Sequence, residues 1–156
     1  MKIKIVAIGK KHDPKIAGSI EDYTMRLGHY IECEWVLYEA KITPSMPEPQ
    51  IKEAESRQLL AYIDQQDIVI LLDERGIALD SMQLADKLQQ LKNQGRKQLV
   101  FVIGGAFGVT SQLQSRADFI WSLSPLVFPH QLVRLILAEQ LYRAHTILAG
   151  EKYHHQ

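Results

Sequence analysis

Two short segments of the chain are apolar without interruption, and they constrain the fold more than any other feature. Residues 67–73 read Asp-Ile-Val-Ile-Leu-Leu-Asp, and residues 99–103 read Leu-Val-Phe-Val-Ile. A strand with one face in water alternates apolar and polar residues, whereas an unbroken apolar run predicts a strand covered on both faces. Amphipathic segments with helical spacing lie between the strand patterns, which is typical of a parallel sheet between two layers of helices.

The rest of the chain continues this alternation. Further strands are predicted at residues 3–8, 31–37 and 119–123. Helices are predicted from Asp13-Pro14 to residue 27, from the Pro-rich loop at residues 43–49 to about residue 64, from a cap at Asp80 or Ser81 to Gly95, as a short helix capped by Thr110, and at residues 130–149. Residues 74–76 are expected to turn the chain. Because no repeat or linker interrupts the pattern, we expect one α/β domain over residues 1–156.

Charge and cysteine content exclude several classes of protein. Eighteen basic residues balance eighteen acidic ones, so the chain as a whole is not drawn to nucleic acid or anionic membrane, and an RNA contact must be a local patch or be built across subunits. Cys33 is the only cysteine, which rules out an intrachain disulfide and a cysteine metal cluster. We expect no metal site, no signal peptide and no membrane span, and therefore a cytoplasmic protein.

A glycine-rich segment, Gly104-Gly105-Ala106-Phe107-Gly108, follows the second apolar strand. Open α/β sheets bind ligands at the carboxyl ends of central strands, and glycine lets the backbone approach a ligand closely. The spacing is neither the dinucleotide fingerprint nor a P-loop, so a tight turn without a ligand stays an equal alternative. Residues 72–76 end the other apolar strand and are a candidate second wall, although Asp73 and Glu74 also suit a solvated turn. We expect a bulky residue at position 105 to block such a pocket.

The helix that begins at His130 is apolar nearly all round, which predicts burial on more than one side. One side can meet the sheet, and the other side is assigned to a partner, so a homodimer is predicted. His130 and Arg134 lie one turn apart next to the loop at residues 128–130, either as ligand-binding residues or as a capping pair. Glu139 and Arg143 have the spacing of a helical ion pair. The tail at residues 153–155 is either frayed or able to stack on a base.

Five segments together resemble the RlmH family, the SPOUT-superfamily methyltransferases that modify N3 of pseudouridine in large-subunit ribosomal RNA. They are Val102-Ile-Gly-Gly-Ala-Phe-Gly108, Ser122-Leu-Ser124, Phe128-Pro-His-Gln-Leu-Val-Arg134, Glu139-Gln-Leu-Tyr-Arg-Ala144 and Gly150-Glu-Lys-Tyr-His154. The resemblance covers essentially the whole chain. It implies a three-layer α/β fold with a deep C-terminal trefoil knot, which topology rules alone would not propose. It also implies a homodimer and S-adenosylmethionine bound in the knot.

Carried over by position, the resemblance assigns site residues. The cofactor walls would be Leu72, Gly104, Gly105, Ser124, Pro125, Leu126, Val127, Phe128 and Pro129, and no metal is implied. Pro125 stands in a position that varies in the family and removes one N–H donor. The candidates for catalysis are His130, Arg134, Tyr153 and His154, because histidine takes up a proton near neutral pH and arginine holds a phosphate or a developing negative charge. The choice of base among them stays open, as does the subunit on which the tail acts.

The reaction that the resemblance implies is methylation of pseudouridine at N3 in 23S ribosomal RNA. Balanced charge favours a target that is presented by the ribosome over free RNA held by charge. Two alternatives stay open from the same residues. One is a SPOUT methyltransferase that acts on another RNA, such as transfer RNA, and the other is a non-catalytic RNA-binding module that retains the pocket.

Overall fold

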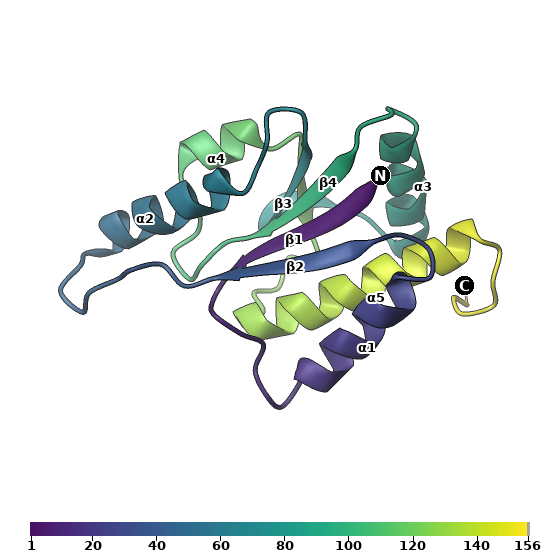
Figure 1. Cartoon of the computed structure of the whole chain (residues 1–156), viewed down its shortest axis with the longest axis horizontal. Coiled ribbons are helices and arrows are strands. Elements are labelled where there is room, and N and C mark those ends of the chain that lie inside the picture. The colour runs from purple at the N-terminus through teal and green to yellow at the C-terminus, as the bar shows by residue number, and fades with distance from the viewer. Residues whose placement is uncertain (156) are drawn as a thin grey trace.

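A computed structural model describes residues 1–155 of the chain. Within them, five strands form one sheet in the order β2-β1-β4-β3-β5, and every neighbouring pair is parallel (Figure 1). The strands are β1 (Lys2–Ile8), β2 (Cys33–Tyr38), β3 (Ile68–Ala78), β4 (Gln98–Ile103) and β5 (Phe119–Ser122). The helices are α1 (Ala17–Leu27), α2 (Glu48–Ala61), α3 (Ser81–Lys92), α4 (Ser111–Arg116) and α5 (His130–Leu148).

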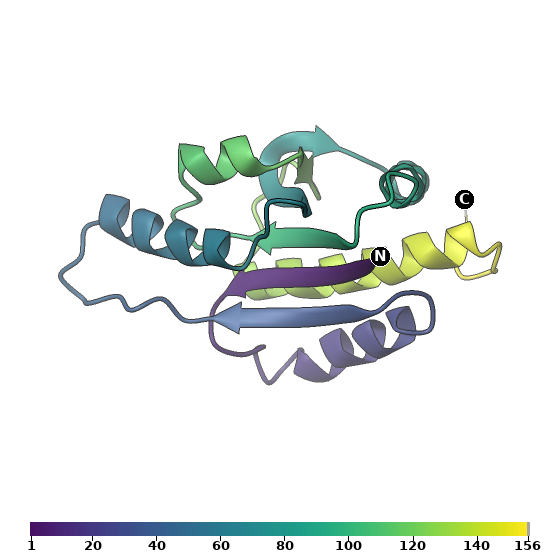
Figure 2. The ribbon, with the colours of Figure 1, turned by 45° about the horizontal axis from the view of Figure 1, so that its top comes forward.

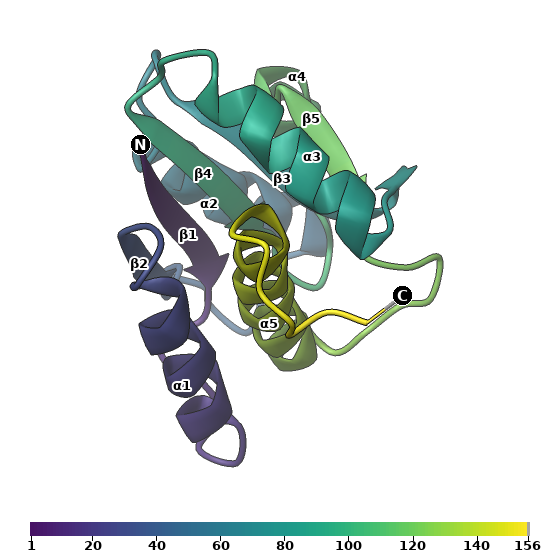
Figure 3. The same ribbon diagram turned by 90° about the vertical axis from the view of Figure 1, so that its right-hand side faces the viewer.

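The sheet lies between two layers of helices, as the apolar runs predict. Successive residues of β4 point to opposite sides, because side chains alternate along a strand. Phe101 packs in the core beneath α3 and α5, whereas Val100 and Val102 pack in the core beneath α2 and α4. Figure 3 shows α1, α3 and α5 in front of the sheet, with α2 and α4 behind it. The predicted three-layer parallel α/β architecture is confirmed.

Strand β3 is longer than the sequence predicts. A turn is expected at residues 74–76, but β3 continues through them to Ala78. It pairs with β5 on both sides of an irregularity between Leu72 and Ile77, so the intervening residues bulge out of the ladder. A Cβ at Gly76 would lie 2.7 Å from the carbonyl carbon of Ile120. The glycine is therefore needed for the close approach of β5, and the expected turn is wrong.

Helix ends differ from the prediction by a few residues. α1 begins at Ala17, because the carbonyl oxygen of Asp13 accepts two backbone N–H bonds and forms a turn ahead of the helix. α2 ends at Ala61, short of residue 64. Two predicted caps are confirmed: Asp80 forms a capping box at the start of α3, and the Thr110 hydroxyl accepts a backbone N–H at the start of α4.

Helix α5 connects the fold to the site. It packs against α1 and α3, and its residues Leu137 and Leu141 are buried in the core, while Leu132 is 38% exposed. The helix begins at the end of the sheet where the strands finish, whereas the N-terminus of the chain and the C-terminal tail lie towards the other end (Figure 2). The trefoil knot and the single domain over residues 1–156 stay predictions, and Gln156 lies outside the described residues.

Candidate functional site

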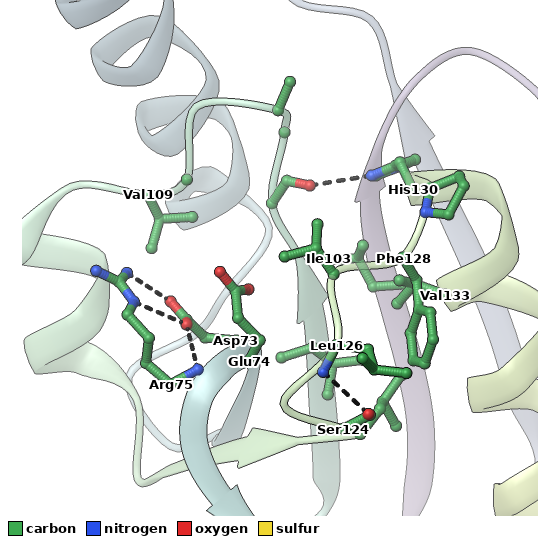
Figure 4. Close-up of a pocket in the computed structure, with 18 residues that line it drawn as sticks. Asp73, Glu74, Arg75, Ile103, Val109, Ser124, Leu126, Phe128, His130 and Val133 are labelled. Atoms are coloured by element: carbon green, nitrogen blue, oxygen red, sulfur yellow. Dashed lines mark hydrogen bonds and ion pairs between the residues drawn. The ribbon is translucent and has the colours of Figure 1, made fainter.

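A cavity of about 430 Å³ opens at the carboxyl ends of β3 and β4, beside the first turn of α5. This volume lies in the range of small-molecule and cofactor pockets. Three segments form its walls: the end of β3, the glycine loop and the loop before α5 (Figure 4). The lining residues are Leu72, Asp73, Glu74, Arg75, Ile103, Gly104, Gly105, Ala106, Gly108, Val109, Leu123, Ser124, Leu126, Val127, Phe128, Pro129, His130 and Val133. The three loops that the sequence places at strand ends therefore meet around one cavity.

The glycine loop, residues 104–108, is shaped by backbone contacts. The Gly108 N–H donates to the Gly105 carbonyl oxygen at 3.1 Å, and Gly108 has a φ of +78°, which favours glycine. A Cβ at position 105 would collide with the carboxyl group of Glu55 on α2. That a bulky residue at position 105 blocks the cavity stays a prediction, and its side chain would also press on Glu55 of α2.

Glu55, which supports the glycine loop from behind, was not predicted. It is 5% exposed, and its Oε1 atom has no hydrogen-bond partner among the described residues. Burial raises the pKa of this carboxyl group, because a charge is poorly solvated there. The neighbouring Ser56 hydroxyl accepts the Thr110 N–H at 3.0 Å, so α2 also bonds to the chain just after the glycine loop.

Residues 73–75, where β3 bulges out of its ladder with β5, contribute the charged wall of the cavity. Arg75 forms a bidentate pair with Asp73, with Nη2 to Oδ2 at 2.8 Å and Nε to Oδ1 at 3.0 Å. The hydrogen bonds from Arg75 lower the pKa of the Asp73 carboxyl group. The Glu74 carboxylate is directed towards the cavity in Figure 4, away from that pair. Asp73 and Glu74 thus both line the cavity, with Asp73 half-buried and Glu74 exposed.

The loop before α5 presents apolar side chains at the mouth of the cavity. The Ser124 hydroxyl accepts the Leu126 N–H at 3.0 Å, and the Ser122 hydroxyl donates to the Ser124 carbonyl oxygen at 2.9 Å. In this loop the side chains of Leu126 and Val127 are exposed to solvent, at 68% and 80%. Large apolar side chains gathered at a cavity mouth indicate a surface that a ligand or partner covers.

Of the nine residues assigned to the cofactor, eight line the cavity: Leu72, Gly104, Gly105, Ser124, Leu126, Val127, Phe128 and Pro129. Pro125 lies in the same loop but is not among the lining residues. Of the four residues assigned to catalysis, only His130 lines it. The binding and catalytic roles of all these residues stay predictions.

His130 is held by hydrogen bonds on both ring nitrogens. Its Nδ1 lies 3.0 Å from the Gly104 carbonyl oxygen, and its Nε2 lies 3.1 Å from Arg134 Nη2. Because a carbonyl only accepts and a guanidinium only donates, the ring is neutral with its proton on Nδ1. Burial, and then the charge of Arg134, lower the pKa of His130. In this arrangement the ring ties α5 to the glycine loop and has no lone pair left for a substrate proton.

Arg134 lies behind His130 and does not line the cavity. It is fully buried, and its guanidinium donates to the carbonyl oxygens of Ile8 at 2.7 Å and Lys11 at 3.0 Å. These contacts join α5 to the segment that follows β1. The structure thus favours neither a phosphate contact by Arg134 nor a simple helix cap, the two roles that the sequence left open.

Tyr153 and His154 pack against the outer side of α5. The Tyr153 hydroxyl donates to Glu139 Oε1 at 3.1 Å, and His154 Nδ1 lies 3.2 Å from Arg143 Nη1. Arg143 also forms the predicted ion pair with Glu139. Burial raises the pKa of Tyr153 well above its usual range, so its phenol is protonated. Glu139 lies about 14 Å along the helix axis from His130 at a rise of 1.5 Å per residue, so one protomer does not bring its tail to its own cavity.

Neither a metal cluster nor a membrane-spanning helix occurs in the described part of the chain. Within residues 1–155, no group of three or more His, Cys, Asp or Glu side chains is placed to hold a metal ion. Over the same residues, each helix is too short or too polar to cross a bilayer.

The fold and the cavity together define a class of protein. A parallel sheet with helices on both faces and a cofactor-sized cavity at the carboxyl ends of its strands is the arrangement of α/β proteins that bind a nucleotide-like ligand. The profile of one protein family, described as predicted SPOUT methyltransferase, matches residues 1–154. The chain therefore belongs to the SPOUT methyltransferase family, as its resemblance to the RlmH family implies.

Individual relatives match the chain over its full length. Proteins named Ribosomal RNA large subunit methyltransferase H are 42% identical in Christiangramia forsetii and 43% identical in Flavobacterium psychrophilum, each over 157 residues and 100% of both chains. The protein of that name in Acetivibrio thermocellus is 39% identical over 99% of both chains. Among solved structures, a probable methylase family protein from Haemophilus influenzae Rd KW20 superposes with a TM-score of 0.52 and 15% identity, over 95% of this chain and 66% of that chain. The structural likeness concerns the fold alone.

Proposed function

We propose that this protein is an S-adenosylmethionine-dependent methyltransferase that methylates N3 of a pseudouridine in large-subunit ribosomal RNA. One observation carries the proposal: relatives at about 40% identity over the whole chain are named for methylation of this RNA. The cavity described above supplies a place for the methyl donor. The choice of N3 of pseudouridine rests on the resemblance to the RlmH family.

The cavity fits S-adenosylmethionine in size and in chemistry. Its walls are mostly apolar, with a free Glu74 carboxylate and the backbone groups of the glycine loop among them. The exposed side chains of Leu126 and Val127 would be covered by an adenosine-sized group. The residues that would hold the cofactor are Leu72, Gly104 and Gly105 on one side, and residues 126–129 on the other. When bound, the cofactor supplies an electrophilic methyl group on a sulfonium.

The protein's part in the reaction is to position the target nitrogen and to accept its proton. His130 is engaged on both ring nitrogens, so we assign it to positioning: it fixes the carbonyl of Gly104 in the cavity wall. Arg134 supports it from behind. Of the predicted catalytic residues, His154 is then the candidate for the base and Tyr153 a candidate for stacking on the target base. Both lie too far along α5 to serve the cavity of their own protomer.

In a homodimer, the tail of one protomer could reach the cavity of the other. The outer side of α5 carries the exposed Leu132, and the cavity mouth carries the exposed Leu126 and Val127. We propose that a second copy packs on these residues and brings its own residues 153 and 154 to the cavity, so that each active site is built from two protomers. Burial of apolar surface would drive the association.

Complementation tests the composite site. One variant lacks residues 153–156, and a second carries Gly104→Leu in the cavity wall. Each variant alone is expected to be inactive on large ribosomal subunits, whereas a mixture that is allowed to exchange protomers regains activity, because heterodimers hold one intact site. A mixture that stays inactive although heterodimers form, or a tail-less variant that methylates at the full rate, contradicts the composite site.

We further place the protein in the cytoplasm, with the assembled ribosome as substrate. The chain has no net charge with which to grip free RNA, which favours a target that is presented in a fixed shape. Labelled methyl transfer to ribosomal particles, to free ribosomal RNA and to transfer RNA would separate the candidates. We expect incorporation into particles. Incorporation into transfer RNA alone favours the other SPOUT activity, and none at all favours a binding module.

A further inference from the structure

A short basic loop, residues 9–15, connects β1 to α1. It reads Gly-Lys-Lys-His-Asp-Pro-Lys and carries three lysines against one aspartate, in a chain whose net charge is zero. Lys10, Lys11 and Lys15 are all exposed. The aspartate is engaged locally, because the Asp13 carboxylate accepts the Lys15 N–H at 2.8 Å. The basic loop is therefore a local patch of positive charge.

The first turn of α5 holds this loop beside the cavity. Arg134 donates to the carbonyl oxygens of Ile8 and Lys11, and the Gln131 side-chain oxygen accepts the Asp13 N–H at 2.9 Å. Gly9 permits the contact: its φ is +112°, and a Cβ there would lie 2.7 Å from Arg134 Nη2. Because His130 begins the same turn and lines the cavity, the basic loop and the cavity are parts of one rigid unit.

Arg134 adds its own charge to this region. It is fully buried, and within residues 1–155 it has no carboxylate partner in an ion pair. A buried charge without a counter-ion is weakly screened, so it raises the positive potential at the neighbouring surface. The exposed Lys10 and Lys11 extend the same potential into solvent. A polyanion is the partner that such a surface attracts.

We infer that the basic loop binds backbone phosphates of the RNA next to the target nucleotide and fixes that nucleotide over the cavity. The inference rests on the proposed function, since it takes RNA to be the substrate. Phosphate contacts set register and orientation, whereas contacts to the base select it. In this assignment the lysines touch the RNA, and Arg134 is a positioning residue that ties the phosphate-binding loop to the methyl-donor cavity.

A matched pair of double variants tests the inference. Lys10→Ala/Lys11→Ala removes two exposed charges from the basic loop. Arg96→Ala/Lys97→Ala removes two exposed charges just before β4, at the opposite end of the sheet from the cavity. Binding of the fluorescently labelled protein to large ribosomal subunits is measured between 50 and 200 mM salt, with S-adenosylmethionine affinity measured in parallel.

We expect the loop variant to bind the ribosomal subunits more weakly and with less salt dependence. Two lost phosphate contacts lower the slope of log affinity against log salt by about 1.4, so wild-type affinity falls about sevenfold more than that of the loop variant over this fourfold salt range. Cofactor affinity and the control variant should match wild type. Unchanged affinity for the subunits and an unchanged salt slope, an equal effect in the control, or no binding of wild type to the subunits would overturn the inference. RNA binding through the loop without methyl transfer to ribosomal particles would leave it standing and refute the proposed function instead.

Discussion

His145 makes the stability of the protein sensitive to acid. The side chain is 2% exposed on α5, and its Nδ1 lies 2.7 Å from the Leu141 carbonyl oxygen, so Nδ1 carries the proton. Nε2 is buried without a partner among the described residues. Protonation would place an N–H there with no acceptor. Burial accordingly lowers the pKa of His145 to about 4, from an ordinary value of 6.5.

The magnitude follows from linkage. Between pH 6.5 and pH 4 the unfolded chain binds a proton at His145 and the folded chain does not, so the free energy of unfolding falls as the pH falls. The loss attributable to this residue is about 2 kcal/mol at pH 5 and about 3 kcal/mol at pH 4, at about 1.4 kcal/mol per pKa unit. Above pH 7 the loss vanishes, because neither state is protonated.

Urea unfolding of wild type and His145→Asn between pH 5 and pH 7.5 measures this loss. The asparagine amide can replace the Nδ1 donor to Leu141 but does not titrate. We expect wild type to lose about 2 kcal/mol more than the variant between pH 7.5 and pH 5, while their other titrating groups cancel. Parallel stability curves for the two proteins would refute a buried neutral histidine at this position.

Three further changes test the site and the dimer. Gly105→Leu should destabilise the protein by about 1–3 kcal/mol, because its side chain overpacks against Glu55, and it should weaken S-adenosylmethionine binding in calorimetry. The control Gly18→Ala, at a position with open space around it, should change neither stability nor binding. Arg134→Ala should lower the free energy of unfolding by about 3 kcal/mol, because buried carbonyls lose their donors, and should abolish methyl transfer; full activity would show that the loop needs no anchor. Leu132→Glu should yield monomers in sedimentation, and a wild-type monomer at micromolar concentration would count against the dimer.

The architecture could be predicted from the sequence because its strongest signals are local. The unbroken apolar runs at residues 67–73 and 99–103 predict the central strands, and Asp80 and Thr110 mark helix starts. Because the carboxyl ends of parallel strands lie at one edge of a sheet, the order of strands and loops along the chain is enough to bring the three cavity loops together. Most of the cavity wall was therefore predictable.

The sequence-based predictions are wrong where contacts between distant parts of the chain determine the local structure. The polar stretch at residues 74–76 resembles a turn, but β3 pairs with β5 on both sides of it, and only the close approach of Ile120 explains Gly76. Arginine is rarely buried without a carboxylate, so the full burial of Arg134 could not be predicted from the sequence. Similarly, residues 153–154 read as a free tail, whereas contacts with Glu139 and Arg143 fold them onto α5.

The central claim is methyl transfer to N3 of pseudouridine in large-subunit ribosomal RNA. Large ribosomal subunits from cells that lack this protein are incubated with it and with isotopically labelled S-adenosylmethionine, and their RNA is digested and analysed by mass spectrometry. A parallel reaction uses subunits that carry uridine in place of the target pseudouridine. We predict one labelled methyl group on the pseudouridine ring at N3 and little label on uridine. Equal labelling of uridine would contradict the pseudouridine preference, and subunits without any label would contradict the claim itself.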